Sequence, residues 1–293
     1  MRPEPMPPRA LRLTDGFTLA LGGGGGRGWT HVGVARALAE RRLRPTRIVG
    51  TSMGAIIGAA LAAGRTPDEI QAASSRFSLY RLVGKGARFA LFDPRPVLDQ
   101  LALDLNDPRI EDLPMPLGIS TYDLVAGRPR LVTSGRLIDA LEVSIAVPLF
   151  FPPRRDADGV WCDAGPWEGI PVSLARAWDP QLPVVGVLAD APKPAFLTSR
   201  VGSSVLRATS RRLGVGRDGD ALTARRFLAL LTARWADPVV NEPPDVLIVP
   251  RLGRRANALR FGQPARAIAA GESETHAVLD AIGQGLRLEP AHA

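Results

Sequence analysis

The feature that most constrains this chain is a strand, glycine turn and helix pattern that occurs twice near its start. A short apolar run at Phe17–Leu21 ends in glycines, and apolar residues then recur at helical spacing over Trp29–Glu40. A second apolar run, Thr46–Gly50, breaks at a turn and continues into the small-residue segment Ala55–Ala63. Two such units predict parallel strands joined by crossover helices. Because ligand sites in such sheets lie beyond the carboxyl ends of the strands, we expect both turns to meet at one site.

The rest of the chain carries further strand and helix signals. Apolar runs predict a strand pair at Leu117–Tyr122 and Arg130–Thr133, and buried strands at Pro183–Leu188 and Val246–Val249. A helix is expected at Asp139–Ile145, stopped by the proline that follows. The stretch Ser74–Leu105 mixes aromatics, arginines and helical periodicity, which is typical of a lid or a side wall.

Size and composition indicate one domain. The chain has 293 residues, 45% of them hydrophobic, so we expect a single α/β domain over residues 17–293 after a proline-rich extension at residues 1–16. The extension lacks the apolar stretch of a secretory signal, and the longest apolar run, Ala55–Ala63, falls short of the ~20 residues that span a bilayer. We therefore expect a soluble, cytoplasmic protein. A single cysteine, Cys162, excludes internal disulfides, and no Cys and His cluster has metal-ligand spacing.

The formal charge of +8 favours acidic partners such as anionic lipid surfaces or nucleic acid. The segment Arg200–Arg226 interleaves arginines with apolar residues at near-helical spacing, which suits peripheral contact with an anionic membrane. The same pattern arises on any basic helix that covers a core, so both interpretations stay open. No nucleic-acid motif or aromatic stacking platform is present, and we expect no nucleic-acid partner. The sequence does not fix the oligomeric state.

Residues 50–54 carry the first chemical signal. Gly50-Thr51-Ser52-Met53-Gly54 fits the pattern G-x-S-x-G after an apolar strand and before a small-residue helix. A nucleophile on such a tight turn needs small neighbours, and the N-terminus of the next helix favours the negative charge that develops there. The pattern also occurs by chance as a structural turn. In this setting we expect Ser52 to be a nucleophile.

The glycine run Gly22–Gly28, interrupted only by Arg27, is a second turn whose backbone N–H groups are not obstructed by side chains. Such amides suit an oxyanion hole, in which each donor commonly contributes ~3–4 kcal/mol. A Walker A loop would need Lys after its last glycine, where this chain has Trp29. A dinucleotide fingerprint would need an acidic residue where this chain has Val49 and Gly50, so both nucleotide alternatives fit poorly.

Together these segments resemble the patatin-like phospholipase family. The family's oxyanion motif G-G-G-x-R-G is matched by Gly23, Gly24, Gly25, Gly26, Arg27 and Gly28. A third family block, S-x-A-x-P-x-x-F-P-P and then D-G-[GA], is similar to Ser144–Pro153 followed by Asp163, Ala164 and Gly165. The resemblance covers roughly Phe17–Leu188, with weaker similarity at Asp245–Pro250.

The resemblance implies a three-layer α/β/α sandwich with a mainly parallel central sheet, and a catalytic dyad of Ser52 and Asp163 with Asp163 as proton acceptor. The sequence departs from the family at Ala164, where Gly is usual, and at Gly169, where Asn is frequent. If the position after the aspartate needs a positive φ, Ala would cost ~1–2 kcal/mol there.

Three residues near these motifs have simpler interpretations. We expect His31 to be a packing or helix-surface histidine, Arg27 to orient the glycine loop by hydrogen bonds to carbonyls, and Cys162 to be a small apolar filler. An acidic lipid headgroup is the alternative ligand of Arg27.

The sequence thus predicts a serine acyl hydrolase that cleaves lipid or other carboxylic esters without metal or organic cofactor. One alternative is an α/β-hydrolase triad of Ser52, Asp163 and His276, which keeps that fold's order of residues. Another is a lipid-binding homologue of weak activity, suggested by Ala164. The headgroup, acyl length and position of cleavage are not determined by the sequence.

Overall fold

The structure is a computed structural model that describes residues 13–76, 93–147, 150–157, 159–189, 242–252 and 264–284. The basic segment Arg200–Arg226 lies outside these ranges, as do most of the N-terminal extension and the middle of Ser74–Leu105. Within the described ranges, no helix is both long enough and apolar enough to cross a membrane.

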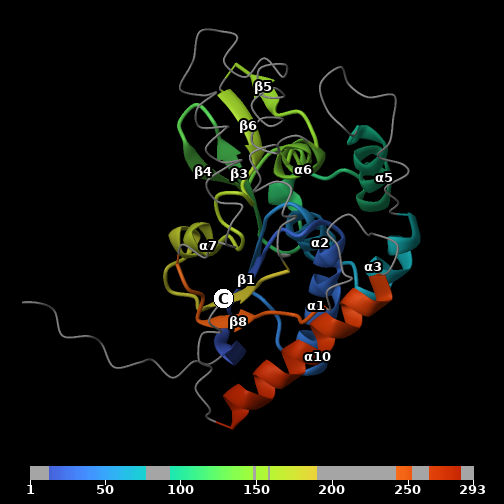
Figure 1. Cartoon of the computed structure of the whole chain (residues 1–293), viewed down its shortest axis with the longest axis vertical. Helices are drawn as coiled ribbons and strands as arrows, with labels where there is room; N and C mark the ends of the chain where they lie inside the picture. The colour runs from blue at the N-terminus through green and yellow to red at the C-terminus, as the bar shows by residue number, and fades with distance from the viewer. Residues whose placement is uncertain are drawn as a thin grey trace, which may run out of the picture.

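One sheet organises the molecule, and its strands follow the order β5-β6-β3-β2-β1-β7-β8, with β4 paired to β3 (Figure 1). The strands are β1 (Thr18–Leu21), β2 (Arg47–Gly50), β3 (Leu117–Asp123), β4 (Arg128–Val132), β5 (Arg154–Asp156), β6 (Gly159–Asp163), β7 (Val184–Val187) and β8 (Val246–Ile248). The centre of the sheet, from β3 through β8, is parallel. The antiparallel pairs β3–β4, β3–β6 and β5–β6 extend one side.

The strands predicted from apolar runs are confirmed, including the antiparallel hairpin of β3 and β4. The parallel pairing of β1 with β2 places Leu21 opposite Gly50, so both strands end at the same level. The strands β5 and β6 were not predicted. The residues of β5 are all charged, and β6 is a short run that pairs with β3, about 40 residues earlier, and with β5.

Helices fill both sides of the sheet. They are α1 (Thr30–Glu40), α2 (Met53–Ala62), α3 (Pro67–Ala73), α5 (Arg95–Leu105), α6 (Leu137–Ser144), α7 (Val172–Trp178) and α10 (Pro264–Gly283), with 3₁₀ turns η1 (Leu13–Asp15), η2 (Gly25–Trp29), η3 (Ser74–Arg76) and η4 (Ile110–Asp112). The start of α3 follows from a capping box, in which Thr66 and Glu69 satisfy each other's backbone N–H, and from Pro67 in the first turn.

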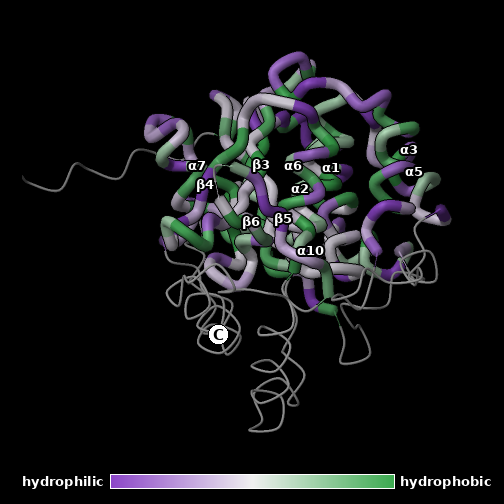
Figure 2. Tube along the Cα trace, turned by 90° about the horizontal axis from the view of Figure 1, so that it is seen from above, coloured by the Kyte–Doolittle hydropathy of each residue, from purple (hydrophilic) through white to green (hydrophobic). Residues whose placement is uncertain are grey.

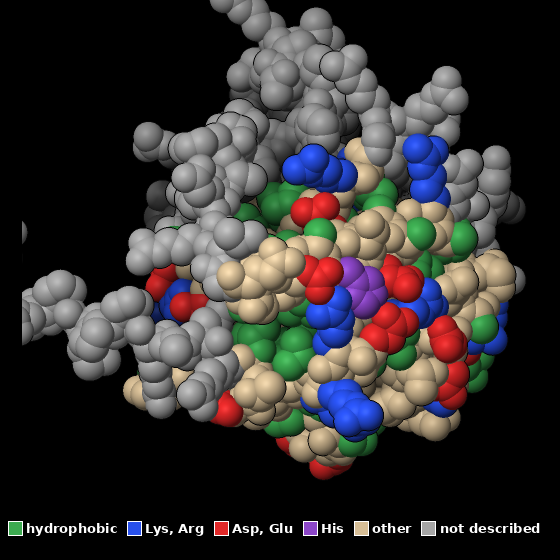
Figure 3. Space-filling model, turned by 90° about the horizontal axis from the view of Figure 1, so that it is seen from below, with side chains coloured by type: hydrophobic (Ala, Val, Ile, Leu, Met, Phe, Trp, Pro, Cys, Tyr) green, Lys and Arg blue, Asp and Glu red, His purple; other side chains and the backbone are tan. Residues whose placement is uncertain are grey.

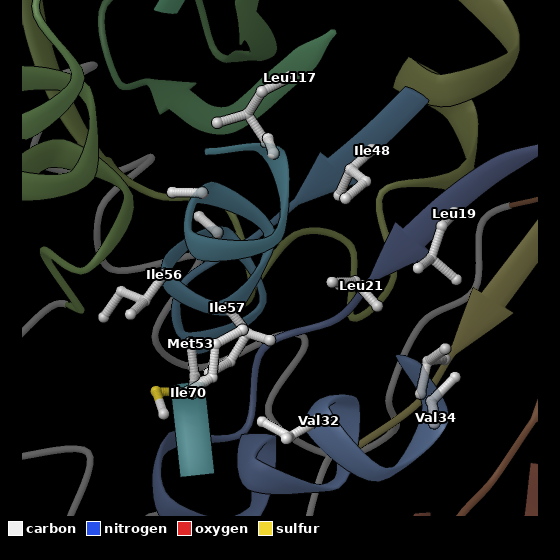
Figure 4. Packing of buried hydrophobic residues seen from close by; sticks show 14 of the residues in the cluster. Leu19, Leu21, Val32, Val34, Ile48, Met53, Ile56, Ile57, Ile70 and Leu117 are labelled. Atoms are coloured by element: carbon white, nitrogen blue, oxygen red, sulfur yellow. The ribbon is translucent and has the colours of Figure 1, made fainter. Parts of the chain in front are cut away.

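Alternation along the strands creates a core on each face. Leu19 and Leu21 of β1 join the larger cluster with α1, α2 and α6, whereas Ala20 faces the smaller cluster with α7. Figure 4 shows Met53 and Ile57 of α2 packed among side chains from the strands and α1. In Figure 1, α7 lies on the opposite side of the sheet from α1 and α2. The fold is therefore the three-layer α/β/α sandwich.

Helix α5 is the main described part of the segment predicted as a lid or side wall, and it forms a side wall of the core. Helix α5 alternates between hydrophobic and hydrophilic positions along its length (Figure 2). Its apolar side chains Val97, Leu98, Leu101 and Leu105 are buried in the larger core, while Leu103 is exposed. The helix thus covers the core next to α6.

The C-terminal helix α10 lies against α1 through facing glycines. A Cβ on Gly33 would lie 1.9 Å from the Ile268 carbonyl oxygen, and one on Gly271 would lie 2.1 Å from the Thr30 carbonyl oxygen. Only glycine permits this approach of two backbones. Thr30 is the first residue of α1 and follows directly after η2. Helix α10 therefore packs against the start of the helix that follows the glycine turn.

We expect Gly271→Ala to lower the free energy of unfolding by about 2–3 kcal/mol, because its methyl group meets backbone that has to move. Gly283→Ala is the matched control in the same helix. Nothing lies within 4 Å of its added Cβ, so it should be neutral or stabilising by about 0.5–1 kcal/mol. Urea unfolding of both variants measures the difference. Equal stabilities would contradict the close contact of α1 and α10.

Candidate active site

Ser52 occupies a strained turn between β2 and α2. Its backbone has φ 55° and ψ −123°, a conformation that non-glycine residues rarely adopt. Ser52 is half-buried, whereas Thr51 and Met53 on either side are buried. The turn therefore presents one side chain, the serine, at the end of the sheet and at the N-terminus of α2.

The glycines flanking Ser52 are required by contact. A Cβ on Gly50 would lie 2.5 Å from the Gly54 carbonyl oxygen, and one on Gly54 would lie 2.3 Å from the Leu21 carbonyl oxygen. The first contact closes the turn on itself, and the second packs it against the end of β1. The sequence requirement for small residues on both sides of the serine thus has a direct steric cause.

The glycine loop lies beside this turn. The Thr51 N–H donates to the Leu21 carbonyl oxygen at 3.0 Å, which joins the two strand ends. A Cβ placed on Gly23 would lie 3.5 Å from the Cβ of Ser52. The two glycine turns predicted to share a site are therefore neighbours.

Some backbone N–H groups of the glycine loop donate hydrogen bonds within the protein, and others do not. The Gly22 N–H donates to the Val187 carbonyl oxygen, and the Gly23 N–H donates to the Gly169 carbonyl oxygen at 3.2 Å. Within the described parts of the chain, the N–H groups of Gly24–Gly26 donate to no acceptor, as expected at the start of a helical turn such as η2. The N–H of Gly23 is thus already used within the protein. The N–H groups of Gly24–Gly26 are the ones that could bind a ligand.

Backbone conformation and a buried arginine hold the loop. Gly24 and Gly25 have φ 143° and φ 55°, values that favour glycine. The Arg27 side chain is buried, and its Nε donates to the Ala189 carbonyl oxygen at 3.0 Å, just beyond the end of β7. This bond to a carbonyl oxygen is of the kind that the predicted orienting role of Arg27 requires.

His31 is fully buried under the same loop, and its Nε2 lies 2.8 Å from the Gly22 carbonyl oxygen. Burial lowers the pKa of His31 to about 4, although the hydrogen bond to Gly22 opposes this shift. The ring is therefore neutral at pH 7, with Nε2–H as the donor to Gly22. His31 is a packing residue that fixes the start of the glycine loop.

Asp163 ends β6 and is almost completely buried. Gly50 at the end of β2 pairs with Ile119 on β3, and Thr121, two residues further along β3, pairs with Asp163. The ends of β2 and β6 therefore lie on either side of β3, and Ser52 follows in the turn after β2. A Cβ on Gly165 would lie 3.0 Å from Asp163 Oδ1 and 3.8 Å from Thr51 Cγ2, which places the aspartate turn against the serine turn.

The alanine after the aspartate causes no strain. Ala164 does not have a positive φ, and its side chain is fully buried. An alanine at this position therefore carries no backbone penalty. The Gly165 N–H donates to Asp163 Oδ1 at 2.6 Å, which fixes the carboxylate within its own turn. The neighbouring Cys162 is buried, and its pKa is raised mainly by burial and further by the charge of Asp163, so the thiol stays protonated as a small apolar filler.

His276 lies away from this site. Its Nε2 is 3.0 Å from Glu40 Oε2 at the end of α1 remote from the glycine loop. An α-helix of 11 residues is about 16 Å long. The alternative triad of Ser52, Asp163 and His276 is therefore wrong, because α1 separates the histidine from the serine turn.

Glu40, Glu272 and His276 form the one group among the described residues whose ligand atoms gather within 4.8 Å. Both carboxylates already have cationic or histidine partners, since Glu272 pairs with Arg36 and Glu40 with His276. On the face seen in Figure 3, a histidine likewise lies among acidic and basic side chains.

The arrangement defines a class of protein: an α/β/α sandwich with a serine on a strand-to-helix turn, a glycine loop beside it and an aspartate turn packed against the serine turn. The family model described as patatin-like phospholipase matches residues 19–176, more than half of the chain. The chain belongs to the patatin-like phospholipase family.

Relatives agree with this assignment, and a solved structure shares the fold. An NTE family protein of Mycobacterium tuberculosis is 33% identical over 190 residues, which are 62% of this chain and 50% of the relative. Patatin-like phospholipase domain-containing protein 7 of Rattus norvegicus is 32% identical over 58% of this chain and 13% of its own length. VipD from Legionella pneumophila shares the fold with a TM-score of 0.56 at 17% identity, over 91% of this chain and 66% of its own. The chain thus spans about half the length of the mycobacterial relative.

We expect the burial of neutral His31 to make stability depend on pH. Above pH 6.5, His31 is neutral in both the folded and the unfolded chain, and the free energy of unfolding does not depend on its titration. As the pH falls below 6.5, His31 takes up a proton in the unfolded chain, whereas in the folded protein it stays neutral down to about pH 4. This linkage removes about 3 kcal/mol between those values, at about 1.4 kcal/mol per pKa unit. His31→Gln keeps an N–H donor for Gly22 without titrating. Urea unfolding from pH 7 to pH 4 should show a smaller loss in the variant, and equal losses would contradict a neutral His31.

We expect Gly23→Ala to fold normally but to lose at least about 10-fold in kcat/KM toward an ester. The added methyl group meets only Ser52 Cβ at 3.5 Å, an ordinary contact, so stability should change by less than about 1 kcal/mol. The same methyl group would crowd the gap between the serine and the loop, where an ester carbonyl has to approach to about 3 Å. Full activity in a folded variant would exclude this gap as the reaction site.

Proposed function

We propose that this chain is a serine acyl hydrolase that cleaves lipid carboxylic esters, with Ser52 as nucleophile and Asp163 as its base. The observation that carries the proposal is the strained Ser52 turn, which lies beside a glycine loop with available N–H groups. Backbone strain of this kind persists only where surrounding contacts enforce it, and it gathers at functional sites. Asp163 supplies the second group, since its turn lies against Thr51 next to Ser52.

In the first step, Ser52 Oγ attacks the ester carbonyl carbon while its proton passes to the Asp163 carboxylate. The carbonyl oxygen becomes an oxyanion, which the N–H groups of Gly24–Gly26 would bind. The helix dipole at the N-terminus of α2 favours the same negative charge. Cleavage of the ester C–O bond then releases the alcohol, which takes the proton from Asp163 and leaves an acyl group on Ser52.

In the second step, Asp163 accepts a proton from water as the water oxygen attacks the acyl carbon. The same loop holds the second oxyanion, and the carboxylic acid departs as the proton returns to Ser52 Oγ. A carboxylate is a weak base for a hydroxyl group, so the dyad depends on short geometry and strong oxyanion stabilisation. The nucleophile, the base and the oxyanion donors all come from the chain, and no cofactor enters the reaction.

Lysophospholipids are a first substrate class to test. A relative from Mycosarcoma maydis named lysophospholipase NTE1 is 29% identical over 171 residues, which are 54% of this chain and 9% of the relative. Phospholipids and soluble esters are the comparison substrates in the same screen. The expected contact of Arg200–Arg226 with anionic membranes stays a prediction, since that segment lies outside the described residues.

We expect Ser52→Ala and Asp163→Asn each to reduce hydrolysis of a short-chain aryl ester by at least about 100-fold, because each removes a group that takes part in bond exchange. His276→Ala should stay within about threefold of the wild type, since His276 pairs with Glu40 at the end of α1 remote from the glycine loop. Initial rates with purified, folded variants make the measurement.

A fluorophosphonate probe separates an enzyme from a lipid-binding homologue. The probe should label the wild type at Ser52 and leave Ser52→Ala unlabelled. Absence of labelling and of hydrolysis in a folded wild-type protein would reject the hydrolase. Full activity of Asp163→Asn would reject the dyad while keeping Ser52 as nucleophile.

A further inference from the structure

The C-terminal end of α6 contacts both members of the proposed dyad. The Ser52 N–H donates to Ser144 Oγ at 2.9 Å, and the Ser144 hydroxyl donates in turn to the Ser120 carbonyl oxygen at 3.0 Å. Two residues later, the Ala146 carbonyl oxygen accepts the Asp163 N–H at 3.2 Å. One short turn of backbone is therefore bonded to the serine turn, to β3 and to the end of β6.

Ser144 has a defined orientation. Its side chain is fully buried, and its hydroxyl accepts one hydrogen bond and donates another. The donor bond to Ser120 on β3 directs the oxygen lone pairs toward the Ser52 N–H. A buried hydroxyl with both functions occupied holds its partners in a fixed geometry.

The residue that bonds to Ser144 is the strained residue itself, since the Ser52 N–H is the donor. Ser52 holds φ 55° and ψ −123°, and its N–H would lose its partner if the backbone rotated toward ordinary values. An amide N–H left without a partner in the interior is costly, so the bond opposes relaxation of the turn. The direction of Ser52 Oγ follows from this backbone conformation.

We propose that Ser144 is a positioning residue that fixes Ser52 relative to Asp163, a role that rests on the proposed function of these two residues. Through Ser144 and Ala146, the end of α6 ties the backbones of Ser52 and Asp163 to one rigid element. Ser144 does not touch the substrate. It sets the distance and angle at which the serine proton passes to the aspartate.

The proposal predicts a loss in kcat rather than in KM. Displacement of a catalytic group by about 1 Å commonly costs about 100-fold in rate. We therefore expect Ser144→Ala to lower kcat about 10- to 100-fold on the short-chain ester, with KM changed by less than about threefold. The rate of fluorophosphonate labelling of Ser52 should fall in parallel.

Two further variants separate positioning from a general loss of stability. Thr275→Val is the control, because the Thr275 hydroxyl is equally buried and donates to the Gly271 carbonyl oxygen within α10. It removes a buried hydroxyl away from Ser52 and should leave kcat within about twofold of the wild type. Ser144→Cys keeps a weak hydrogen-bonding group of similar shape and should be intermediate in rate. It replaces Ser144→Ala in all comparisons if the alanine variant does not fold.

The decisive comparison repeats the Ser144 substitution in the Asp163→Asn background. If Ser144 acts by aligning Ser52 with Asp163, the substitution should lower the labelling rate there by less than about threefold, because the base is already lost. An equal loss in both backgrounds would overturn the proposal, as would a kcat no lower than that of Thr275→Val. If Ser52→Ala abolishes labelling while Ser144→Ala leaves kcat unchanged, the positioning role alone fails. Unchanged activity in Ser52→Ala would reject the proposed function itself.

Discussion

The close approach of two glycine turns is the constraint on which the site depends. Gly54 lies so near the Leu21 carbonyl oxygen that a Cβ would fall 2.3 Å from it, and the Thr51 N–H bonds the same oxygen. These contacts force the chain to leave β2 and enter α2 through the strained conformation of Ser52. Because the turn is anchored to the end of β1, the loop that continues from β1 lies beside the serine.

Hydrogen bonds to backbone carbonyl oxygens hold the glycine loop in place. His31 is kept uncharged by burial and bonds the Gly22 carbonyl oxygen, while Gly23 donates to the Gly169 carbonyl oxygen. Within the described structure, the N–H groups of Gly24–Gly26 have no acceptor. Arg27 is the one cation of the motif, and its bond to the Ala189 carbonyl oxygen serves the loop. The proposed oxyanion site is thus built from preorganised amides.

Local sequence was sufficient where a pattern and its cause lie in the same segment. The strands β1 and β2, the helices α1 and α2 and the turn at Ser52 follow from apolar runs and adjacent glycines. The strand β6 was missed because its partner β3 is distant in sequence, although it carries Asp163. Helix α10 was also missed. Its heptad-like spacing is diluted by small and charged residues, and its buried face is defined by α1, more than 200 residues earlier.

By itself the sequence determined the family, the α/β class and the candidate residues Ser52 and Asp163, because short motifs record the steric needs of a turn. Tertiary structure decided which glycine N–H groups remain available, since Gly169 occupies that of Gly23. It also removed His276 from the site by pairing it with Glu40. Finally, it brought Ser144 to the Ser52 N–H across 92 residues. Such contacts depend on how separate elements pack, and no local pattern encodes them.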